Sequence, residues 1–196
     1  MRPPARATAC AAALLAAALA LGGCSSFSPR EALRGRNLET AHQPPPGSAA
    51  FRALALEKTP SVVVLKVDGD DIQSNMAIVS QALLAKGYSV RDYHVTLREL
   101  ARAGLLARKP LDPEALRDAA RLFSETAAVA GSVEVLQLEP LRAQLSLAWI
   151  DLKSGKTLWS AKATYAGYVF GEGDRYEAAL RDMVERALAP LPAAKP

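Results

Sequence analysis

Cysteine and histidine are scarce in this chain, and their positions restrict the chemistry that it can carry. Its 196 residues include two cysteines and two histidines. Both cysteines, Cys10 and Cys24, lie near the start of the chain. His42 and His94 stand far apart in the sequence, so with one cysteine they make a poor set of zinc ligands. We therefore expect no metal site and no cofactor.

An excess of charge of one sign is also lacking. The chain has 24 lysines and arginines against 20 acidic residues, a net charge of +4. Two of the arginines, Arg2 and Arg6, lie in the first 23 residues, and without them the net charge falls to +2. Nucleic-acid-binding domains usually carry a concentrated basic patch. The near balance of charge therefore argues against nucleic acid as a partner.

The first 23 residues have the three zones of a secretory signal. Arg2 and Arg6 give a positive start, residues 11–21 are an unbroken run of alanine and leucine, and Gly22 and Gly23 close the run with small side chains. The apolar run is far shorter than the ~20 residues that a membrane-spanning helix needs. We predict that residues 1–23 are a signal peptide that is removed.

The end of this region, Leu-Gly-Gly-Cys at residues 21–24, resembles a lipobox, the motif that lipoprotein signal peptidase reads. The resemblance implies cleavage before Cys24 and acyl chains such as palmitate on that cysteine, and several acyl chains hold a protein on a membrane stably. Cys10 would leave with the signal, so no disulfide could form within the mature chain. Ser25 follows rather than aspartate, which in lipoprotein sorting implies the periplasmic face of the outer membrane. An ordinary signal peptide with a chance cysteine is the alternative.

A linker and one domain are expected after the cysteine. We predict a disordered, proline-containing linker over residues 24–50, because three consecutive prolines at 44–46 cannot sit inside a helix and favour extended chain. A globular domain then covers residues 51–192, and residues 193–196 form a tail. About 145 residues are enough for one domain with a real core.

Hydrophobic patterning in the domain predicts alternating strands and helices. Short β-branched or alternating runs indicate strands, and apolar residues spaced by three and four indicate helices. The order β-α-β-α-α-β-β-β-α predicts an α/β (α+β) fold with a single mixed sheet and helices packed on it. The strands are expected at residues 61–67, 88–92, 127–138, 141–152 and 156–165, and the helices after Asp70–Asp71, after Thr96 with Glu99 as a capping box, after Asp112 and after Asp174.

Two glycines and two tryptophans give finer expectations. Gly131 within a strand suggests a bulge or a close backbone approach. A hairpin loop at residues 153–155 would place Gly155 in the left-handed conformation that suits glycine. That register sets Trp149 opposite Trp159, whereas a two-residue loop would shift it. Facing aromatic side chains add about 0.2–1 kcal/mol of stability.

The chain resembles the CsgG/LpoB/TolB-N-terminal-like family of bacterial envelope lipoproteins. One segment that carries the likeness is residues 127–133, a hydrophobic strand that ends Gly-Ser-Val and follows a helix. The other is residues 145–160, a strand, a turn around Asp151 and Gly155, and a strand with a tryptophan near its end. The resemblance implies a non-enzymatic adaptor on a mixed α/β domain. It transfers no functional residue, because both motifs are structural.

The remaining motifs give weak signals for catalysis. His94 has Asp92 and Ser89 nearby in sequence, but a catalytic triad is recognised by geometry rather than by nearness along the chain. Residues 68–71, Asp-Gly-Asp-Asp, lack the spacing of a calcium loop, and helix capping explains them better. We therefore expect that the protein is not an enzyme.

The glycine-rich segment 167–173 is the best candidate for a partner contact. It lacks the lysine and the spacing of a phosphate-binding loop. Its aromatic residues Tyr168 and Phe170 would suit a protein interface, where aromatic side chains are enriched. The alternative is that both side chains cover the edge of the sheet or the core.

The sequence therefore favours one function and keeps a second open. The first is a lipid-anchored adaptor or accessory factor for an envelope protein complex in cell-wall synthesis, secretion or assembly. The second is an auxiliary lipoprotein of a lipid or solute transport system that binds an apolar ligand between sheet and helices. Expected partners are the membrane and a periplasmic or envelope protein, with a homo-oligomer left open.

Overall fold

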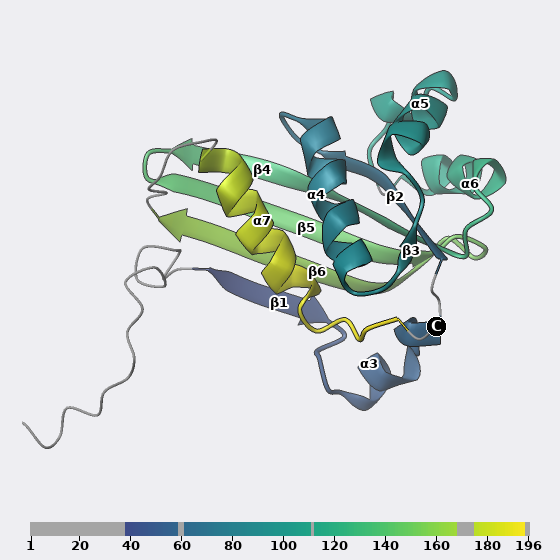
Figure 1. Ribbon diagram of the computed structural model, residues 1–196, viewed down its shortest axis with the longest axis horizontal. Coiled ribbons are helices and arrows are strands. Elements are labelled where there is room, and N and C mark those ends of the chain that lie inside the picture. The colour runs from purple at the N-terminus through teal and green to yellow at the C-terminus, as the bar shows by residue number, and fades with distance from the viewer. Residues whose placement is uncertain (1–37, 59–60, 111, 168–174, 195–196) are drawn as a thin grey trace, which may run out of the picture. The chain divides into compact units, whose positions relative to one another are not determined.

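The computed structural model describes residues 38–58, 61–110, 112–167 and 175–194 (Figure 1). Cys24 and the rest of the predicted signal lie outside these residues, as do Tyr168 and Phe170. The elements in chain order are β1 (Glu39–Gln43), α3 (Ala49–Ala53), a 3-10 turn (Leu56–Lys58), β2 (Ser61–Asp68), α4 (Ile72–Ala85), β3 (Ser89–Val90), α5 (Tyr93–Arg102), a 3-10 turn (Leu105–Ala107), α6 (Pro113–Leu122), β4 (Ala127–Leu138), β5 (Leu141–Asp151), β6 (Lys156–Gly167) and α7 (Arg175–Leu188).

The strands form one mixed sheet of six strands in the order β1-β6-β5-β4-β2-β3. β2 runs parallel to β3 and β4, and the other pairs are antiparallel. From β2 to α7 the elements follow the predicted order β-α-β-α-α-β-β-β-α. The predicted α/β (α+β) class with a single mixed sheet is therefore confirmed.

The predicted linker was too long at its C-terminal end. Residues 39–43 form β1, which pairs with β6 from Glu39 opposite Thr164 to Gln43 opposite Ser160, and residues 49–53 form α3. β1 is an edge strand with mostly exposed side chains, so it lacks the hydrophobic alternation that marks a strand in sequence. His42 is its inward residue: its ring stacks on Trp159 at 5.6 Å, and Nε2 lies 3.0 Å from the carbonyl oxygen of Ala187.

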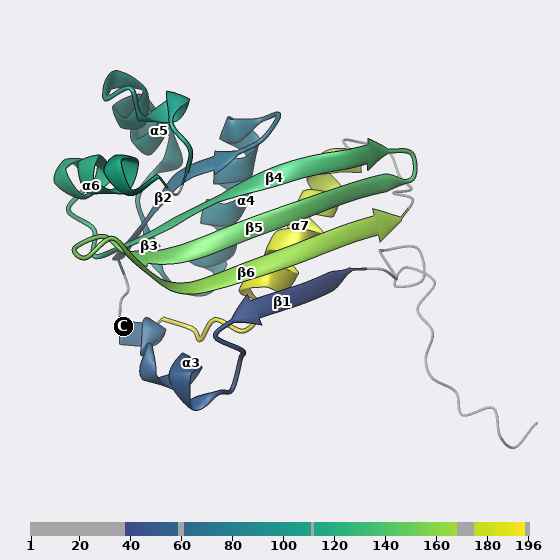
Figure 2. The same ribbon diagram turned by 180° about the vertical axis from the view of Figure 1, so that it is seen from behind.

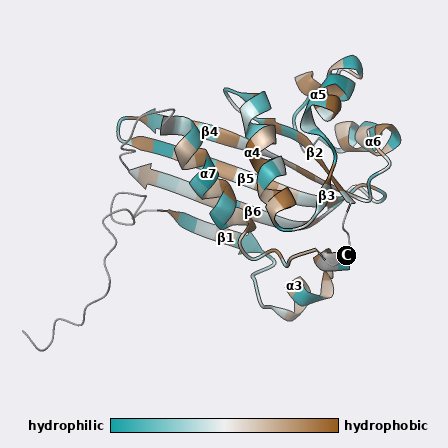
Figure 3. Ribbon diagram, in the orientation of Figure 1, coloured by the Kyte–Doolittle hydropathy of each residue, from teal (hydrophilic) through white to brown (hydrophobic). Residues whose placement is uncertain are grey.

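Helices cover the two faces of the sheet unequally. α4 and α7 lie side by side over one face, where α4 packs on β2 and α7 packs on β6 and β5 (Figures 1 and 2). Both helices alternate hydrophobic and hydrophilic stretches along their turns (Figure 3). α5 packs on β2, and α5 and α6 both lie on the side of the sheet that carries β2 and β3. Within the described residues, no helix lies on the opposite face of β1, β6 and β5 or on most of that face of β4 (Figure 2).

The β5–β6 hairpin confirms the predicted pairing of Trp149 with Trp159, but by a different route. The loop has four residues rather than three, because Asp151 pairs with Lys156. A bulge at Leu158 then shifts the register by one residue, since Ile150 pairs with Thr157. The two differences cancel at the tryptophans, and both are fully buried. Gly155 has φ 68°, the left-handed conformation predicted for it.

Helix capping follows the sequence at two helices and differs at a third. Asp71 caps α4 by accepting a hydrogen bond from the Ser74 amide, which holds the pKa of the Asp71 carboxyl below its ordinary value. Asp112 caps α6, with Pro113 in its first turn as expected. The capping box of Thr96 and Glu99 is wrong, because α5 begins one turn earlier under Asp92.

The C-terminal segment is tied to the turn after α4. The Lys86 ammonium donates hydrogen bonds to the carbonyl oxygens of Ala189 and Leu191, and burial lowers its pKa. The Tyr88 hydroxyl donates to the Pro192 carbonyl oxygen at 2.9 Å, and the Ala194 amide donates to the Lys86 carbonyl oxygen at 3.0 Å. The first half of the predicted tail is therefore part of the folded domain.

An ionic cluster joins the start of α5 to the start of β4. The Arg91 guanidinium donates to Glu125 at 3.1 Å and to both carboxylate oxygens of Glu99, and it lies over the Phe123 ring. The side chain of Glu125 is 11% exposed. Removing Arg91 would leave this carboxylate nearly buried without its cation.

We predict that Arg91→Met destabilises the domain by about 2–3 kcal/mol, because breaking a buried ion pair from one side leaves an uncompensated charge. Urea denaturation followed by circular dichroism measures the change. Arg121→Met is the matched control, because the ion pair of Arg121 with Asp118 is exposed and such pairs contribute less than about 1 kcal/mol. Equal denaturation midpoints for the two variants would contradict the prediction.

Candidate functional site

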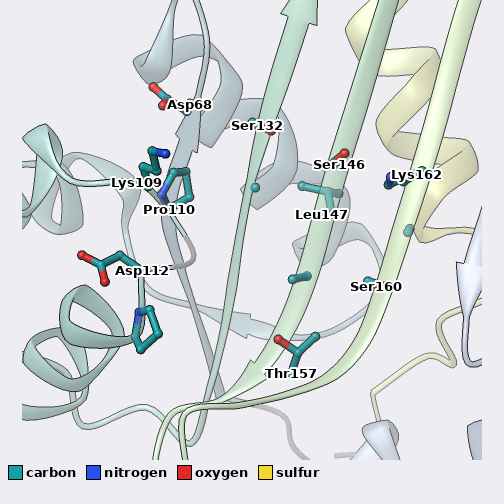
Figure 4. Close-up of a pocket in the computed structure, with 14 residues that line it drawn as sticks. Asp68, Lys109, Pro110, Asp112, Ser132, Ser146, Leu147, Thr157, Ser160 and Lys162 are labelled. Carbon is teal, nitrogen blue, oxygen red and sulfur yellow. The ribbon is translucent and has the colours of Figure 1, made fainter.

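A groove of about 790 Å³ lies on the helix-free face of the sheet, beside the loop that leads into α6 (Figure 4). Its floor is formed by β4, β5 and β6, and its wall by Lys109, Pro110, Asp112 and Pro113. Cavities of about 300–1,000 Å³ are the usual size of small-molecule sites. The lining residues that belong to β2, β4, β5 and β6 are Asp68, Gly131, Ser132, Ser146, Leu147, Ala148, Thr157, Ser160, Ala161 and Lys162.

The floor of the groove results from the alternation of large buried side chains with small side chains along the strands. On β5 the large side chains Leu145, Leu147 and Trp149 are buried, whereas Ser146 between them is partly exposed. Successive side chains of a strand point to opposite faces, so the large residues pack under α4 and α7 and the small ones face the groove. The strand register aligns Ser132, Ser146 and Lys162 in one row across β4, β5 and β6.

The two carboxylates beside the groove already have hydrogen-bond or ion-pair partners, whereas its two lysines form no salt bridge with the described side chains. Asp68 forms an ion pair with Lys66 at 3.1 Å and accepts a hydrogen bond from the Gly69 amide. Asp112 accepts the Glu114 amide as the cap of α6. Among the described side chains, neither Lys109 nor Lys162 has a salt bridge. The groove therefore offers serine hydroxyls on its floor and ammonium groups from two sides, which suits a ligand with hydroxyl or anionic groups.

The residues singled out for catalysis do not come together. His42 lies in β1 against α7, and His94 lies in α5, where its ring is 4.0 Å from that of Tyr93. The segment 68–71 caps α4, as the sequence indicated. Across the described ranges, no three histidine, cysteine, aspartate or glutamate side chains gather to hold a metal ion. The same search range contains no helix long and apolar enough to cross a membrane.

Sequence reasoning missed the groove. Its hydroxyl side chains come from three strands, and each is an ordinary polar residue of an alternating strand when read alone. Only the strand register brings Ser132 beside Ser146, and only the path of the chain before α6 brings Lys109 and Pro110 over them. The signal in the sequence was the small size of the outward residues Ser132, Ser146 and Ser160 near the middle of these strands.

Comparison with known proteins gives a likeness in fold. No protein-family model matches the chain, and no curated sequence matches it. Two structures of a PelC dodecamer from Paraburkholderia phytofirmans are similar to it, both at 17% identity and covering 99% of PelC. They cover 80% and 81% of this chain, with TM-scores of 0.52 and 0.51. Lipoprotein GNA1162 from Neisseria meningitidis is 18% identical, with 66% of this chain and 96% of GNA1162 covered and a TM-score of 0.46.

The chain therefore shares its fold with PelC over nearly the whole of that protein. The finer resemblance to the CsgG/LpoB/TolB-N-terminal-like family stays a prediction. So does the assignment of Cys24, Tyr168 and Phe170, which lie outside the described part of the chain.

Proposed function

We propose that this chain is an outer-membrane lipoprotein, anchored through Cys24, whose periplasmic domain assembles into a homo-oligomer and serves as a non-enzymatic accessory factor of an envelope protein complex. The observation that carries the proposal is the fold shared with PelC, whose structures are dodecamers. The likeness covers the whole domain rather than a common substructure, because 99% of PelC is matched.

The sequence at the start of the chain supports the proposed lipid anchor and the proposed location at the outer membrane. The Leu-Gly-Gly-Cys sequence before Ser25 resembles a lipobox, and the domain begins at β1 only 15 residues after Cys24. A short tether of this kind keeps a domain close to the membrane that holds its acyl chains.

The groove supports a binding role over a catalytic one. General acid–base chemistry needs a group that is positioned and able to exchange a proton at the reacting atom. Here Asp68 is paired with Lys66, and Asp112 is occupied by the α6 cap. The remaining polar groups are serine and threonine hydroxyls and two lysines, which are suited to holding a partner or a ligand.

Oligomerisation and partner capture test the proposal together. The mature protein, purified in detergent, is expected to have a mass several times that of one chain by light scattering. Crosslinking in cells is expected to capture one envelope protein, and Tyr168→Ala with Phe170→Ala should abolish that capture while leaving the circular dichroism spectrum unchanged. Lys153→Ala, on an exposed turn, is the control. A monomer that captures nothing would refute the proposal, and capture by the double variant would refute the contact at Tyr168 and Phe170.

The groove favours a second function, an auxiliary lipoprotein of a lipid or solute transport system. The ligand would be an amphiphile, with apolar parts against Pro110 and Pro113 and a polar head near Lys109 and Lys162. Native mass spectrometry of the purified protein distinguishes the two functions, because a retained phospholipid supports the second. Ser146→Trp, which fills the groove without touching the core face, should then remove the bound lipid.

A further inference from the structure

Two leucines near the end of β4 are unusually exposed. Leu136 is 60% exposed and Leu138 is 77% exposed, more than any other large hydrophobic side chain in the described part of the chain. They flank Gln137 in the last residues of β4, next to the β4–β5 turn. Leu138 pairs with Leu141 across that turn. Exposed leucines on a strand end invite association, and soluble domains usually place charged residues there.

The local geometry turns both side chains outward. The pairing of β4 with β5 shifts between Val135 and Gln137, which makes Leu136 the extra residue of a bulge. A bulge re-aims the side chains beside it and bends the strand. The next inward residues, Val133 and Leu141, are buried, so the core does not need the two leucines.

This hairpin end is also the end at which the chain enters the domain. Leu141 pairs with Gly167 of β6, and Glu39, the first residue of β1, pairs with Thr164 only three residues away on the same strand. Figures 1 and 2 both show the β4–β5 turn and the start of β1 at the same end of the sheet. The β5–β6 turn at Gly155 lies at the other end, a strand length of about 35–40 Å away.

The point at which the chain enters the domain favours this end for a contact with the membrane that holds Cys24. Glu39 is the fifteenth residue after Cys24, and a chain of that length reaches at most about 50–55 Å when fully extended. For the far end of the sheet to meet the lipid first, the connecting chain would have to extend over the length of the sheet, about 35–40 Å, whereas the hairpin with Leu136 and Leu138 needs no such extension.

We propose that Leu136 and Leu138 insert into the surface of the membrane that holds Cys24, and so fix the orientation of the domain on that membrane. This inference rests on the lipid anchor of the proposed function. Two leucines cover far too little area for a stable contact between two copies, which needs about 800 Å² from each partner. A lipid surface needs no complementary partner shape and adds to an anchor already in place.

The charges beside the leucines define the lipid. Among the described residues near this end, the exposed charged side chains include the carboxylates Glu39, Glu134 and Glu139 and the cation Arg142. Carboxylates gain nothing from anionic headgroups, so insertion is apolar and occurs on zwitterionic phospholipid. We expect it to be insensitive to added anionic lipid and to salt, unlike the binding of basic patches.

Fluorescence quenching in proteoliposomes tests the inference. The mature, lipidated protein carrying Leu138→Cys is labelled with an environment-sensitive fluorophore and reconstituted in phosphatidylethanolamine and phosphatidylcholine vesicles that contain lipid-borne quenchers. Cys10 leaves with the signal and the Cys24 sulfur is acylated, so position 138 holds the available thiol. Lys153→Cys, at the β5–β6 turn, is the matched control. We expect at least about twofold greater quenching at 138, since inserted residues lie roughly 5–10 Å inside the interface.

Each outcome has a separate meaning. Equal quenching at 138 and 153 in protein that floats with the vesicles overturns the insertion but leaves the anchor intact. Wild-type protein that fails to float refutes the anchor itself, and the inference with it. A label at 138 that is shielded without vesicles, and more so at high protein concentration, would assign the leucines to a second copy and overturn the proposal. Adding Leu136→Ser to the labelled protein should reduce quenching at 138 while the circular dichroism spectrum stays unchanged.

Discussion

Replacing Gly131 with alanine will destabilise the domain by about 4 kcal/mol or more, a size of effect that single substitutions seldom reach. A Cβ atom at this position would lie 2.0 Å from the Ser146 carbonyl oxygen and 2.9 Å from Cδ2 of Leu147. The first contact is with backbone, so a side-chain rotation cannot relieve it. β4 is held between β2 and β5, and moving either neighbour breaks paired hydrogen bonds.

The loss would be a large part of the stability of an ordinary domain, which is about 5–15 kcal/mol. Urea denaturation followed by tryptophan fluorescence measures it, because Trp149 and Trp159 are both buried. Gly167→Ala is the matched control in the same sheet: its Cβ would meet the Tyr165 side chain at an ordinary 3.7 Å. If the two variants unfold at the same urea concentration, β4 and β5 do not approach as closely at Gly131 as described.

The proposed lipid anchor predicts that replacing Cys24 with serine removes the protein from the outer membrane. Serine cannot carry the thioether-linked lipid, and without its acyl chains the domain keeps only contacts that are weak by comparison. We expect either a folded protein released to the periplasm or an unprocessed precursor. Metabolic labelling with palmitate and membrane fractionation measure both results, and labelling should fall to background.

The other cysteine gives the control for this experiment. Cys10 lies in the predicted signal peptide, so Cys10→Ser should incorporate palmitate like the wild type. A Cys24→Ser protein that is cleaved and still fractionates with the outer membrane would show that another feature holds it there, and the proposed anchor would be wrong.

Elements of the sheet could be predicted where the sequence pattern is local. The β-branched run in β2 and the alternation in β5 and β6 each mark a strand through residues that are close together in the sequence. The tryptophan pairing was also predictable, but only because an extra loop residue and the bulge at Leu158 offset one another. The loop length alone predicts one strand register, and it cannot reveal that a bulge further along the strand shifts that register back.

Elements that depend on distant partners could not be predicted. β1 is polar along most of its length, and its strand conformation comes from hydrogen bonding to β6, about 120 residues later in the chain. The single inward residue, His42, was interpreted as part of a spacer because its contacts, Trp159 and Ala187, are equally remote. The groove was missed for the same reason, since its row of Ser132, Ser146 and Lys162 exists only after the strands pair.

The contacts of the last residues bear on when folding can finish. α7 covers β5 and β6, and Ala189, Leu191, Pro192 and Ala194 hydrogen-bond to the turn after α4, more than 100 residues earlier. A chain that is still emerging lacks this helix, so the apolar face of β5 and β6 has nothing to cover it. Contacts of such long range form late, because the loop between them must close first. The domain therefore completes its fold only after α7 and the residues that follow it are available, which agrees with the proposal that the chain is exported before it folds.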